Sequence, residues 1–388
     1  MKKFLILLIL ALTLCAGVSC APKENRNQDP ESELSNSVYS ELEISSFELS
    51  SPELSSSEAA TTAAESRPEE LKLPEALEKM TVPYLRTLDY SSKLEYDKDA
   101  VVEYGENFRT YIASYMTNDG FKLNGLLAVP EGEAPEGGWP AVVFIHGYKY
   151  PPTYETNGSS YRNYWGAIAR AGYVVFKIDL RGHGVSEGRA NGPYFSGSYI
   201  IDALCARGAL QSCGFVNPDG IGLWGHSMAG NIVSRSMAVQ PEIPAGVIWA
   251  GAVYTYTDFA EYGITDPTYV AMSSEPPVSG ETDRADMYSI MQDLRGNPSE
   301  LSKKFFGELS MLNYIGDLKG ALEIHHAIDD DVVSVEYSRN LAGLLEEKGA
   351  DYEYYEYETG GHNITAPSFS PAMERTLAFY DKRLKGAE

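Results

Sequence analysis

One serine lies in a sequence context that could make it a nucleophile. Residues 220–231 read GIGLWGHSMAGN, in which apolar residues alternate with glycine before Ser227 and a helical pattern begins after it. A strand that turns abruptly into a helix at Ser227 would hold the hydroxyl on a strained, exposed corner. The helix N-terminus would supply N–H groups and positive partial charge where an oxyanion forms. The segment therefore predicts a nucleophile, although a simple glycine–serine turn has the same composition.

A serine nucleophile needs a base and an orienting acid, and both residue types follow along the chain. Residues 322–333 read LEIHHAIDDDVV, an apolar run that enters an acidic loop. Residues 352–357 alternate like a strand, and His362 follows them after two glycines. The order serine, acid, histidine is one of those in which such triads occur. We therefore expect His362 to be the base.

Five segments in this order resemble a known family. From about residue 107 to the C-terminus the chain resembles an α/β-hydrolase, closest to the catalytic domain of prolyl oligopeptidase-like serine peptidases and their esterase relatives. Ala229 stands where the nucleophile motif usually has glycine. The segments that carry the resemblance are HGY (146–148), DLRGHGVS (179–186), GHSMAG (225–230), HAIDDDVV (326–333) and GH (361–362).

The resemblance implies which carboxylate is the acid. In the family loop the acid lies four residues after the histidine that ends the strand, and a pair of valines begins two residues later. Counting from His326 gives Asp330 and fits the valines at 332–333, whereas counting from His325 gives Asp329 and misplaces them by one. We therefore predict Asp330 as the acid, with Asp329 as the alternative.

The resemblance also implies the mechanism, which is acyl transfer through a covalent intermediate. His362 would remove the proton of Ser227, and the serine would attack a carbonyl carbon. The oxyanion would accept hydrogen bonds from the backbone N–H groups of Tyr148 and Met228. Such a mechanism needs no metal and no organic cofactor, and the sequence contains no Cys/His cluster with metal-ligand spacing.

These residues must be positioned by an α/β fold. Short apolar runs alternate with helical patterns, which predicts a mostly parallel central sheet with helices on both faces. The predicted strands are 142–145, 173–178, 221–224, 246–250, 322–327 and 352–357, preceded by an antiparallel hairpin of 111–117 and 121–129 that would form the sheet edge. The carboxyl ends of the parallel strands would bring the candidate residues together.

Several other residues that could take part in chemistry are expected to have structural roles. We expect His146 to shape the turn that aims the Tyr148 N–H, and His226 to pack beside the nucleophile. The loop that begins at Asp179 would be held by a contact between Asp179 and Arg181. Its glycines lack the register of a phosphate-binding loop.

The N-terminus predicts export. Residues 1–20 contain two lysines, a short apolar run and small residues before Cys20, which resembles a bacterial lipoprotein signal peptide with Cys20 as the lipidation site. An ordinary secretory signal is the alternative. Residues 21–75 are rich in Ser and Glu and predict a disordered tether, and residues 76–388 form the expected catalytic domain.

Composition excludes several partners. The net charge is −24, and residues 21–70 contribute only twelve acidic and three basic residues to it, so the expected domain is itself strongly acidic. An acidic domain argues against nucleic acid as a partner and against docking on anionic lipid through its own surface. We expect Cys205 and Cys213 to be buried free thiols, because eight residues of helix would separate them too far for a disulfide.

The substrate is less well specified. Residues 252–313 form a long insertion in the position of a lid, and together with Tyr150 and Tyr154 they predict a pocket with aromatic walls. Such walls suit peptides, aryl esters and acylated sugars alike. The expected function is therefore a serine hydrolase acting on a small ester or peptide. The alternatives are a carboxylesterase for aryl or acylated-sugar esters and, in another class, a non-catalytic surface binding lipoprotein.

Overall fold

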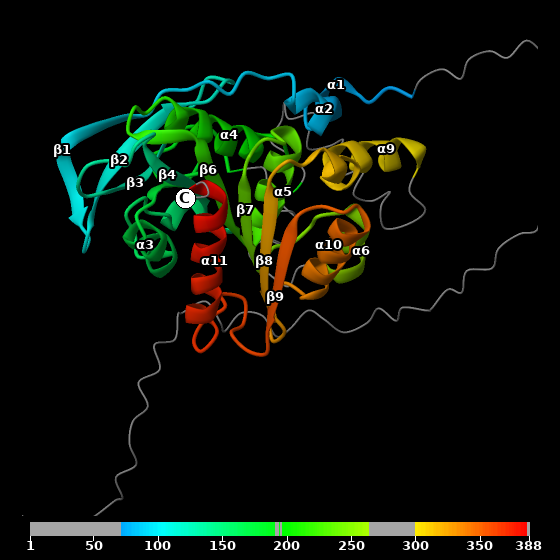
Figure 1. The fold of residues 1–388 in the computed structure, drawn as a ribbon. Helices are drawn as coiled ribbons and strands as arrows, with labels where there is room; N and C mark the ends of the chain where they lie inside the picture. Colours follow the sequence, from blue (N-terminus) through cyan, green and yellow to red (C-terminus); the bar gives the residue numbers. More distant parts are fainter. Residues whose placement is uncertain (1–70, 191–193, 195, 264–298, 386–388) are drawn as a thin grey trace, which may run out of the picture. The chain divides into compact units, whose positions relative to one another are not determined.

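The computed structural model describes residues 71–190, 194, 196–263 and 299–385 (Figure 1). The predicted signal peptide with Cys20, the predicted tether up to residue 70 and residues 264–298 of the predicted lid lie outside these residues. Within the last part of the predicted tether, Leu73 packs against the core and Glu75 begins the first helix.

The strands of the described residues form one twisted sheet in the order β1-β2-β3-β5-β4-β6-β7-β8-β9 (Figure 1). The six strands from β5 to β9 in this order are parallel, and β1, β2 and β3 are antiparallel to their neighbours. The strands are β1 (Glu95–Tyr104), β2 (Phe108–Met116), β3 (Lys122–Pro130), β4 (Trp139–Ile145), β5 (Val174–Ile178), β6 (Val216–His226), β7 (Ala245–Trp249), β8 (Ala321–Ala327) and β9 (Tyr352–Tyr357).

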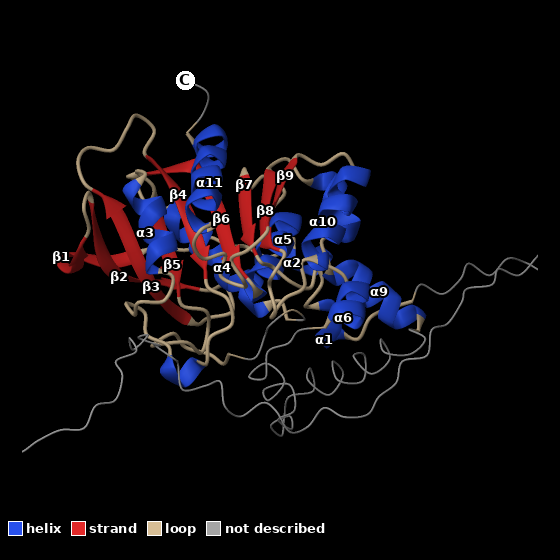
Figure 2. Ribbon diagram, turned by 90° about the horizontal axis from the view of Figure 1, so that it is seen from below, coloured by secondary structure: helices blue, strands red, loops and turns tan. Residues whose placement is uncertain are grey.

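Helices cover both faces of the sheet (Figure 2). Helices α3 (Arg162–Arg170) and α11 (Phe369–Leu384) pack on one face, and α4 (Ser198–Gln211), α5 (Met228–Val239) and α10 (Glu336–Glu347) pack on the other. The shorter elements are α1 (Glu75–Glu78), α2 (Val82–Leu85), η1 (Pro151–Thr153), α6 (Tyr256–Tyr262), α9 (Glu300–Leu309) and η2 (Leu312–Asp317).

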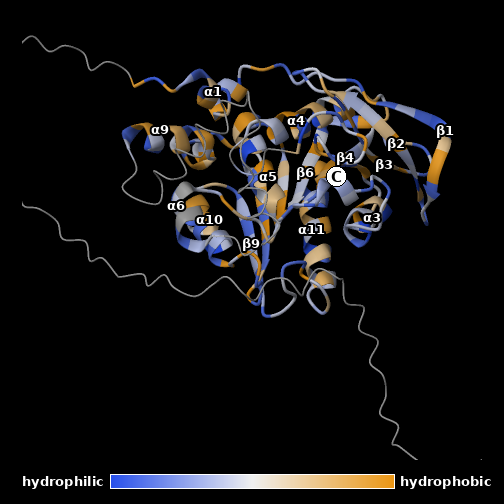
Figure 3. Ribbon diagram, turned by 180° about the vertical axis from the view of Figure 1, so that it is seen from behind, coloured by the Kyte–Doolittle hydropathy of each residue, from blue (hydrophilic) through white to orange (hydrophobic). Residues whose placement is uncertain are grey.

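Two hydrophobic cores result, one on each face of the sheet. Strands β5, β7 and β8 are buried along their whole length, as strands of a covered parallel sheet should be, although β5 contains Lys177 and β8 contains Glu323 and two histidines. Hydrophobic residues are concentrated in the central strands and in the helices beside them (Figure 3). On the face of α3 and α11, Phe144 stacks on Trp224 with ring centroids 4.1 Å apart. The predicted strands of the parallel region and the predicted hairpin are thus present.

The antiparallel end of the sheet is larger than the sequence indicates. The hairpin forms strands β2 and β3, with a turn in which the Gly120 N–H donates to the Thr117 carbonyl (3.0 Å). The edge strand, however, is β1, which pairs with β2 through an irregular register. The prediction that the hairpin forms the edge was wrong, because β1 reads EYDKDAVVEY and lacks the apolar alternation that marks a half-buried strand.

The described ends of the predicted lid pack on the body of the protein. Helix α9 buries Phe305, Phe306 and Leu309 in the core, and in α6 Asp258 accepts a hydrogen bond from the Asn340 side chain. Every helix among the described residues is too short or too polar to cross a bilayer.

The two cysteines differ in burial. Cys205 in α4 is buried, and burial raises the pKa of its thiol to about 12. Cys213 is a free thiol as well but is only half-buried, because it follows the end of the helix. The prediction that both thiols are buried therefore holds for Cys205 alone.

Candidate active site

Ser227 lies at the sharp corner between strand β6 and helix α5. Its backbone has φ 56° and ψ −121°, a left-handed conformation that is strained for a residue with a side chain. A Cβ at Gly225 would lie 2.6 Å from the Ala229 carbonyl oxygen, and one at Gly230 would lie 2.7 Å from the Gly251 Cα. The two glycines therefore permit the close packing of α5 against its neighbours. Ala229, at the position where the motif usually has glycine, is fully buried, so the site accommodates its methyl group.

Asp330 lies in the loop after β8 and is held by several donors. Its Oδ1 accepts the backbone N–H groups of Val332 and Val333, both at 2.9 Å. Its Oδ2 lies 2.8 Å from Nδ1 of His362 and 3.2 Å from Nε2 of His326. The side chain is fully buried. The structure thus places Asp330 against His362, and brings neither Asp329 nor Asp331 to that ring.

The donors around Asp330 determine its protonation. Burial raises the pKa of the carboxyl, but the hydrogen bonds from His326 and His362 and the Val333 N–H outweigh burial, so the pKa of Asp330 lies well below its usual range. The carboxylate is therefore ionised at neutral pH. An ionised acid beside Nδ1 keeps the proton of a neutral imidazole on that nitrogen and leaves Nε2 as the acceptor.

His362 lies in the loop after β9 with its ring open on one side. The side chain is 16% exposed, and within the described part of the chain its Nε2 makes no hydrogen bond. Among the described residues no hydrogen bond joins Ser227 Oγ to His362, as is common in enzymes without bound substrate. The ring of His362 lies 4.6 Å, centroid to centroid, from that of His226, the residue before the serine.

The turn after β4 carries one of the two predicted oxyanion donors. The Gly147 N–H donates to the Tyr161 hydroxyl at 3.1 Å, which holds the turn immediately before Tyr148. Met228 is the first residue of α5, so its N–H belongs to the first turn, where amides have no partner within the helix. Tyr148 and Met228 lie shortly after the carboxyl ends of strands β4 and β6, which are parallel neighbours in the sheet.

Several contacts around the base were not predicted from the sequence. Both carboxylate oxygens of Asp329 accept backbone N–H groups, from Gly361 (2.8 Å) and Gly360 (3.2 Å), directly before His362. The Tyr164 hydroxyl donates to the carbonyl of the next residue, Asn363, at 2.6 Å. No motif marks these partners, because they are brought together only by the fold.

The loop after β5 is held differently from the prediction. Arg181 pairs with Asp202 (2.6 Å) and Asp119 (2.7 Å) rather than with Asp179, so that prediction was wrong. Asp179 instead accepts the hydroxyls of Tyr154 (2.7 Å) and Thr156. Tyr154 therefore faces the protein interior, whereas Tyr150, the other expected pocket residue, is 51% exposed.

The remaining histidines have structural surroundings. His146 is buried, and its Nδ1 contacts the Gly147 carbonyl at 2.7 Å. His325 and His326 on β8 point to opposite faces of the sheet, one to Tyr357 and the other to Ser338. Within the described residues no cluster of three or more His, Cys, Asp or Glu side chains could hold a metal ion.

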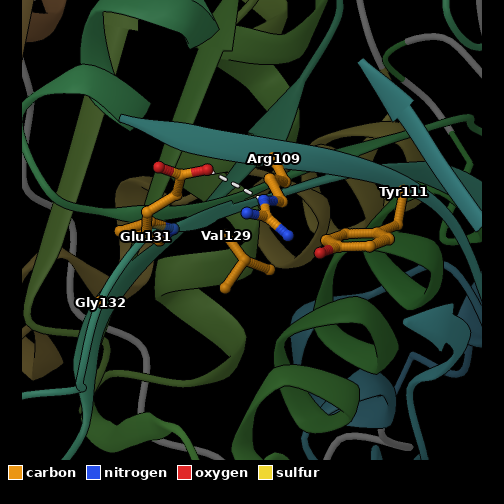
Figure 4. A pocket seen from close by; sticks show the side chains of 6 residues that line it. Arg109, Tyr111, Val129, Glu131 and Gly132 are labelled. Carbon is orange, nitrogen blue, oxygen red and sulfur yellow. Dashed lines mark hydrogen bonds and ion pairs between the residues drawn. The ribbon is translucent and has the colours of Figure 1, made fainter. Parts of the chain in front are cut away.

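A hollow of about 280 Å³ lies elsewhere, on the β2–β3 hairpin (Figure 4). An ion pair between Arg109 and Glu131 (2.9 Å) spans it, and Tyr111 lies beside the arginine. The sheet order separates this hairpin from β6 by two strands, so the hollow is not part of the candidate site.

Comparisons with known proteins identify the family of the chain. Residues 142–365 match the alpha/beta hydrolase family. The uncharacterized peptidase YuxL of Bacillus subtilis is 23% identical over 255 residues, which are 65% of this chain and 35% of YuxL. The chain thus spans about a third of the length of this curated relative.

Solved structures show the same fold. An acetyl xylan esterase from Paenibacillus sp. R4 aligns with a TM-score of 0.55 at 16% identity, over 80% of this chain and 96% of that one. A puromycin-hydrolyzing peptidase of Mycobacterium tuberculosis aligns with a TM-score of 0.52 at 23% identity, over 72% of this chain and 40% of that one.

Proposed function

The chain belongs to the alpha/beta hydrolase family, and from this premise we propose that it is a serine hydrolase that cleaves ester or amide bonds through an acyl-enzyme. Ser227 is the nucleophile, His362 the base and Asp330 the acid of this proposal. The oxyanion accepts the N–H groups of Tyr148 and Met228.

The proposed reaction has two halves. His362 Nε2 removes the proton of Ser227 Oγ as the oxygen attacks the substrate carbonyl, and the imidazolium then protonates the leaving alcohol or amine. Water, deprotonated by the same nitrogen, attacks the acyl-serine, and the imidazolium returns that proton to Ser227 Oγ as the oxygen leaves, which releases the acid and restores the enzyme. Asp330 stabilises the imidazolium in both halves.

One observation carries this proposal: the buried carboxylate of Asp330 contacts Nδ1 of a histidine whose other nitrogen is open. The imidazole is thereby oriented and polarised for proton transfer at Nε2. The strained backbone of Ser227 at the head of α5 supports it independently.

Two substrate classes fit the proposal. The match to YuxL and the fold shared with a peptidase support peptides. A second candidate, a carboxylesterase for aryl or acylated-sugar esters, is supported by the alignment to an acetyl xylan esterase over nearly its whole length. Esters are the easier reaction, because an alkoxide or phenoxide leaves more readily than an amine.

Paired substrates test the proposal. We expect the purified protein to hydrolyse p-nitrophenyl acetate, acetylated xylo-oligosaccharides or aminoacyl p-nitroanilides, and the ratio of kcat/KM between esters and amides to identify the class. Ser227→Ala should lower kcat by about 10⁶-fold. A folded wild-type protein without turnover on any of these substrates would favour the alternative of a surface binding protein.

The proposed location is the bacterial cell envelope, with a lipid anchor on Cys20, and a secreted protein is the alternative. The apolar run followed by small residues and Cys20 supports the anchor. Stable anchoring takes two or more acyl chains, so the mature protein should fractionate with membranes. Unchanged processing and membrane partition of Cys20→Ala would contradict this proposal.

A further inference from the structure

We propose that Tyr161 and His226 are positioning residues, which form a hydrogen-bonded strut that joins the oxyanion turn to the loop of the base. This inference rests on the proposed function, because it assigns the strut to the placing of His362 and of the Tyr148 amide. Neither residue touches the reacting atoms in the proposed mechanism.

Three hydrogen bonds make up the strut. The Gly147 N–H donates to the Tyr161 hydroxyl at 3.1 Å, and that hydroxyl lies 2.8 Å from His226 Nδ1. His226 Nε2 lies 2.8 Å from the backbone carbonyl oxygen of His362. The chain of bonds thus runs from the residue before Tyr148, past the residue before Ser227, to the base itself.

The ends of the strut dictate the direction of every bond. A backbone N–H can only donate and a carbonyl can only accept, so Gly147 is the first donor and His362 the last acceptor. His226 must then carry its proton on Nε2 and accept on Nδ1, and Tyr161 must donate to that Nδ1. One proton arrangement satisfies all three bonds.

Burial keeps His226 in the state that this arrangement needs. Burial lowers the pKa of His226 to about 3, and the neighbouring His362 lowers it as well. The imidazole is therefore neutral in the pH range in which a serine hydrolase works. A protonated His226 would carry a proton on both ring nitrogens, so its Nδ1 could no longer accept the hydrogen bond from the Tyr161 hydroxyl.

The packing around the strut leaves it little freedom. A Cβ at Gly147 would lie 2.8 Å from the Tyr161 hydroxyl and 3.1 Å from His226 Nδ1, so the turn lies directly against the two side chains. Tyr161 has φ 60° before α3, and its ring packs edge-on against those of Phe144 and Trp224. A displacement at one end is therefore transmitted to the other.

The test uses substitutions that remove single bonds. Tyr161→Phe removes the central hydroxyl. His226→Asn keeps an acceptor near the Nδ1 position but loses the donor to His362, whereas His226→Gln can keep a donor near the Nε2 position. Tyr173→Phe is the matched control, because Tyr173 is buried and its hydroxyl donates to Asp381 of α11 (2.6 Å). Tyr173 directly precedes β5, so it lies at the amino end of the parallel strands, away from the candidate site at their carboxyl ends.

We expect Tyr161→Phe and His226→Asn to lower kcat on p-nitrophenyl acetate by about 10- to 100-fold with little change in KM, because small misplacements of catalytic groups cost this much. His226→Gln should recover most of the kcat lost in His226→Asn, and Tyr173→Phe should turn over like wild type. The four variants and wild type are compared as folded protein by circular dichroism.

If Tyr161→Phe had the same kcat as wild type, the proposed positioning role would be wrong, even if His226→Asn failed to fold. Equal losses in His226→Asn and His226→Gln would also overturn it, because mere packing beside the serine would not distinguish a donor from an acceptor. These outcomes differ from failure of the proposed function, in which wild type itself would be inactive and Ser227→Ala indistinguishable from it.

Discussion

Two of the histidine–carboxylate pairs on or near strand β8, His325–Glu323 and His362–Asp330, differ in geometry, and only the second suits catalysis. His325 and Glu323 are both fully buried in the middle of the strand, with His325 Nε2 2.6 Å from the Glu323 carboxylate. His362 and Asp330 lie at the carboxyl end of the sheet, 2.8 Å apart, and His362 is partly exposed.

The two imidazoles differ in how many of their nitrogens are in use. His325 Nδ1 contacts the Tyr357 hydroxyl (2.8 Å), and its Nε2 is shared between Glu323 and Thr376 (3.1 Å). His362 uses only Nδ1 in the described part of the chain. A base must keep one nitrogen for the proton of the nucleophile, so the free Nε2 suits His362 for that role and the occupied nitrogens of His325 do not.

Among changes to these two pairs, removing the charge of Asp330 should have the largest effect on kcat. Asp330→Asn should lower kcat by about 10⁴-fold, because an amide favours the wrong tautomer of His362. The corresponding change in the other pair, Glu323→Gln, should leave kcat per folded molecule unchanged. Steady-state kinetics of both variants, with circular dichroism for folding, measure this difference, and equal losses of kcat would break the comparison.

Removing the structural carboxylate should affect stability instead. Glu323→Ala leaves His325 buried without its carboxylate partner, and loss of one member of a buried pair costs about 3–5 kcal/mol in the free energy of unfolding. Glu336→Ala, which breaks an exposed pair with Arg339, is the control and should cost about 0–1 kcal/mol. Urea unfolding distinguishes the two, and a Glu323→Ala variant as stable as Glu336→Ala would remove the structural role.

The acid should also contribute to stability in a pH-dependent manner. The pKa of Asp330 is lowered in the folded protein, so the ionised carboxylate stabilises the fold above the ordinary carboxyl pKa of about 3.9. That contribution is lost as the pH falls through the lower folded value. The difference in free energy of unfolding between wild type and Asp330→Asn should therefore shrink as the pH is lowered from 6 to 3, and a constant difference would contradict this account.

The neighbouring aspartates should show the smallest effects. From the sequence alone both Asp329 and Asp331 would matter far less than Asp330, but the structure separates them. Asp329→Ala removes two hydrogen bonds to the backbone before His362. Because each bond contributes about 1 kcal/mol or less to holding that backbone, we expect kcat to fall about 10-fold. Asp331 is exposed, and Asp331→Ala should match wild type. Equal kinetics of the two alanine variants would show that Asp329 does not position the base.

Sequence predicts most of what depends on short-range pattern. The parallel strands were predicted from short apolar runs and, for residues 352–357, from alternation, and Ser227 was predicted because its glycines lie within three residues of it. The edge strand β1 was missed because its polar sequence carries no such pattern.

What remained unpredicted depends on partners far apart in the chain. Arg181 pairs with residues 21 positions ahead and 62 positions behind, and Tyr161 meets His226 across 65 positions. Neither pairing follows from spacing, because only the fold brings these side chains together. The position of Asp330 was predictable only through the resemblance of its loop to a family.

A fluorophosphonate probe tests the central claim most directly, because it reacts covalently with an activated serine. The protein is incubated with the probe, and the modified residue is identified by peptide mass spectrometry in wild type, Asp330→Asn and Glu323→Gln. We predict a single adduct on Ser227, formed far more slowly in Asp330→Asn and at the wild-type rate in Glu323→Gln. An adduct on another residue, or a rate that Asp330→Asn leaves unchanged, would contradict the account.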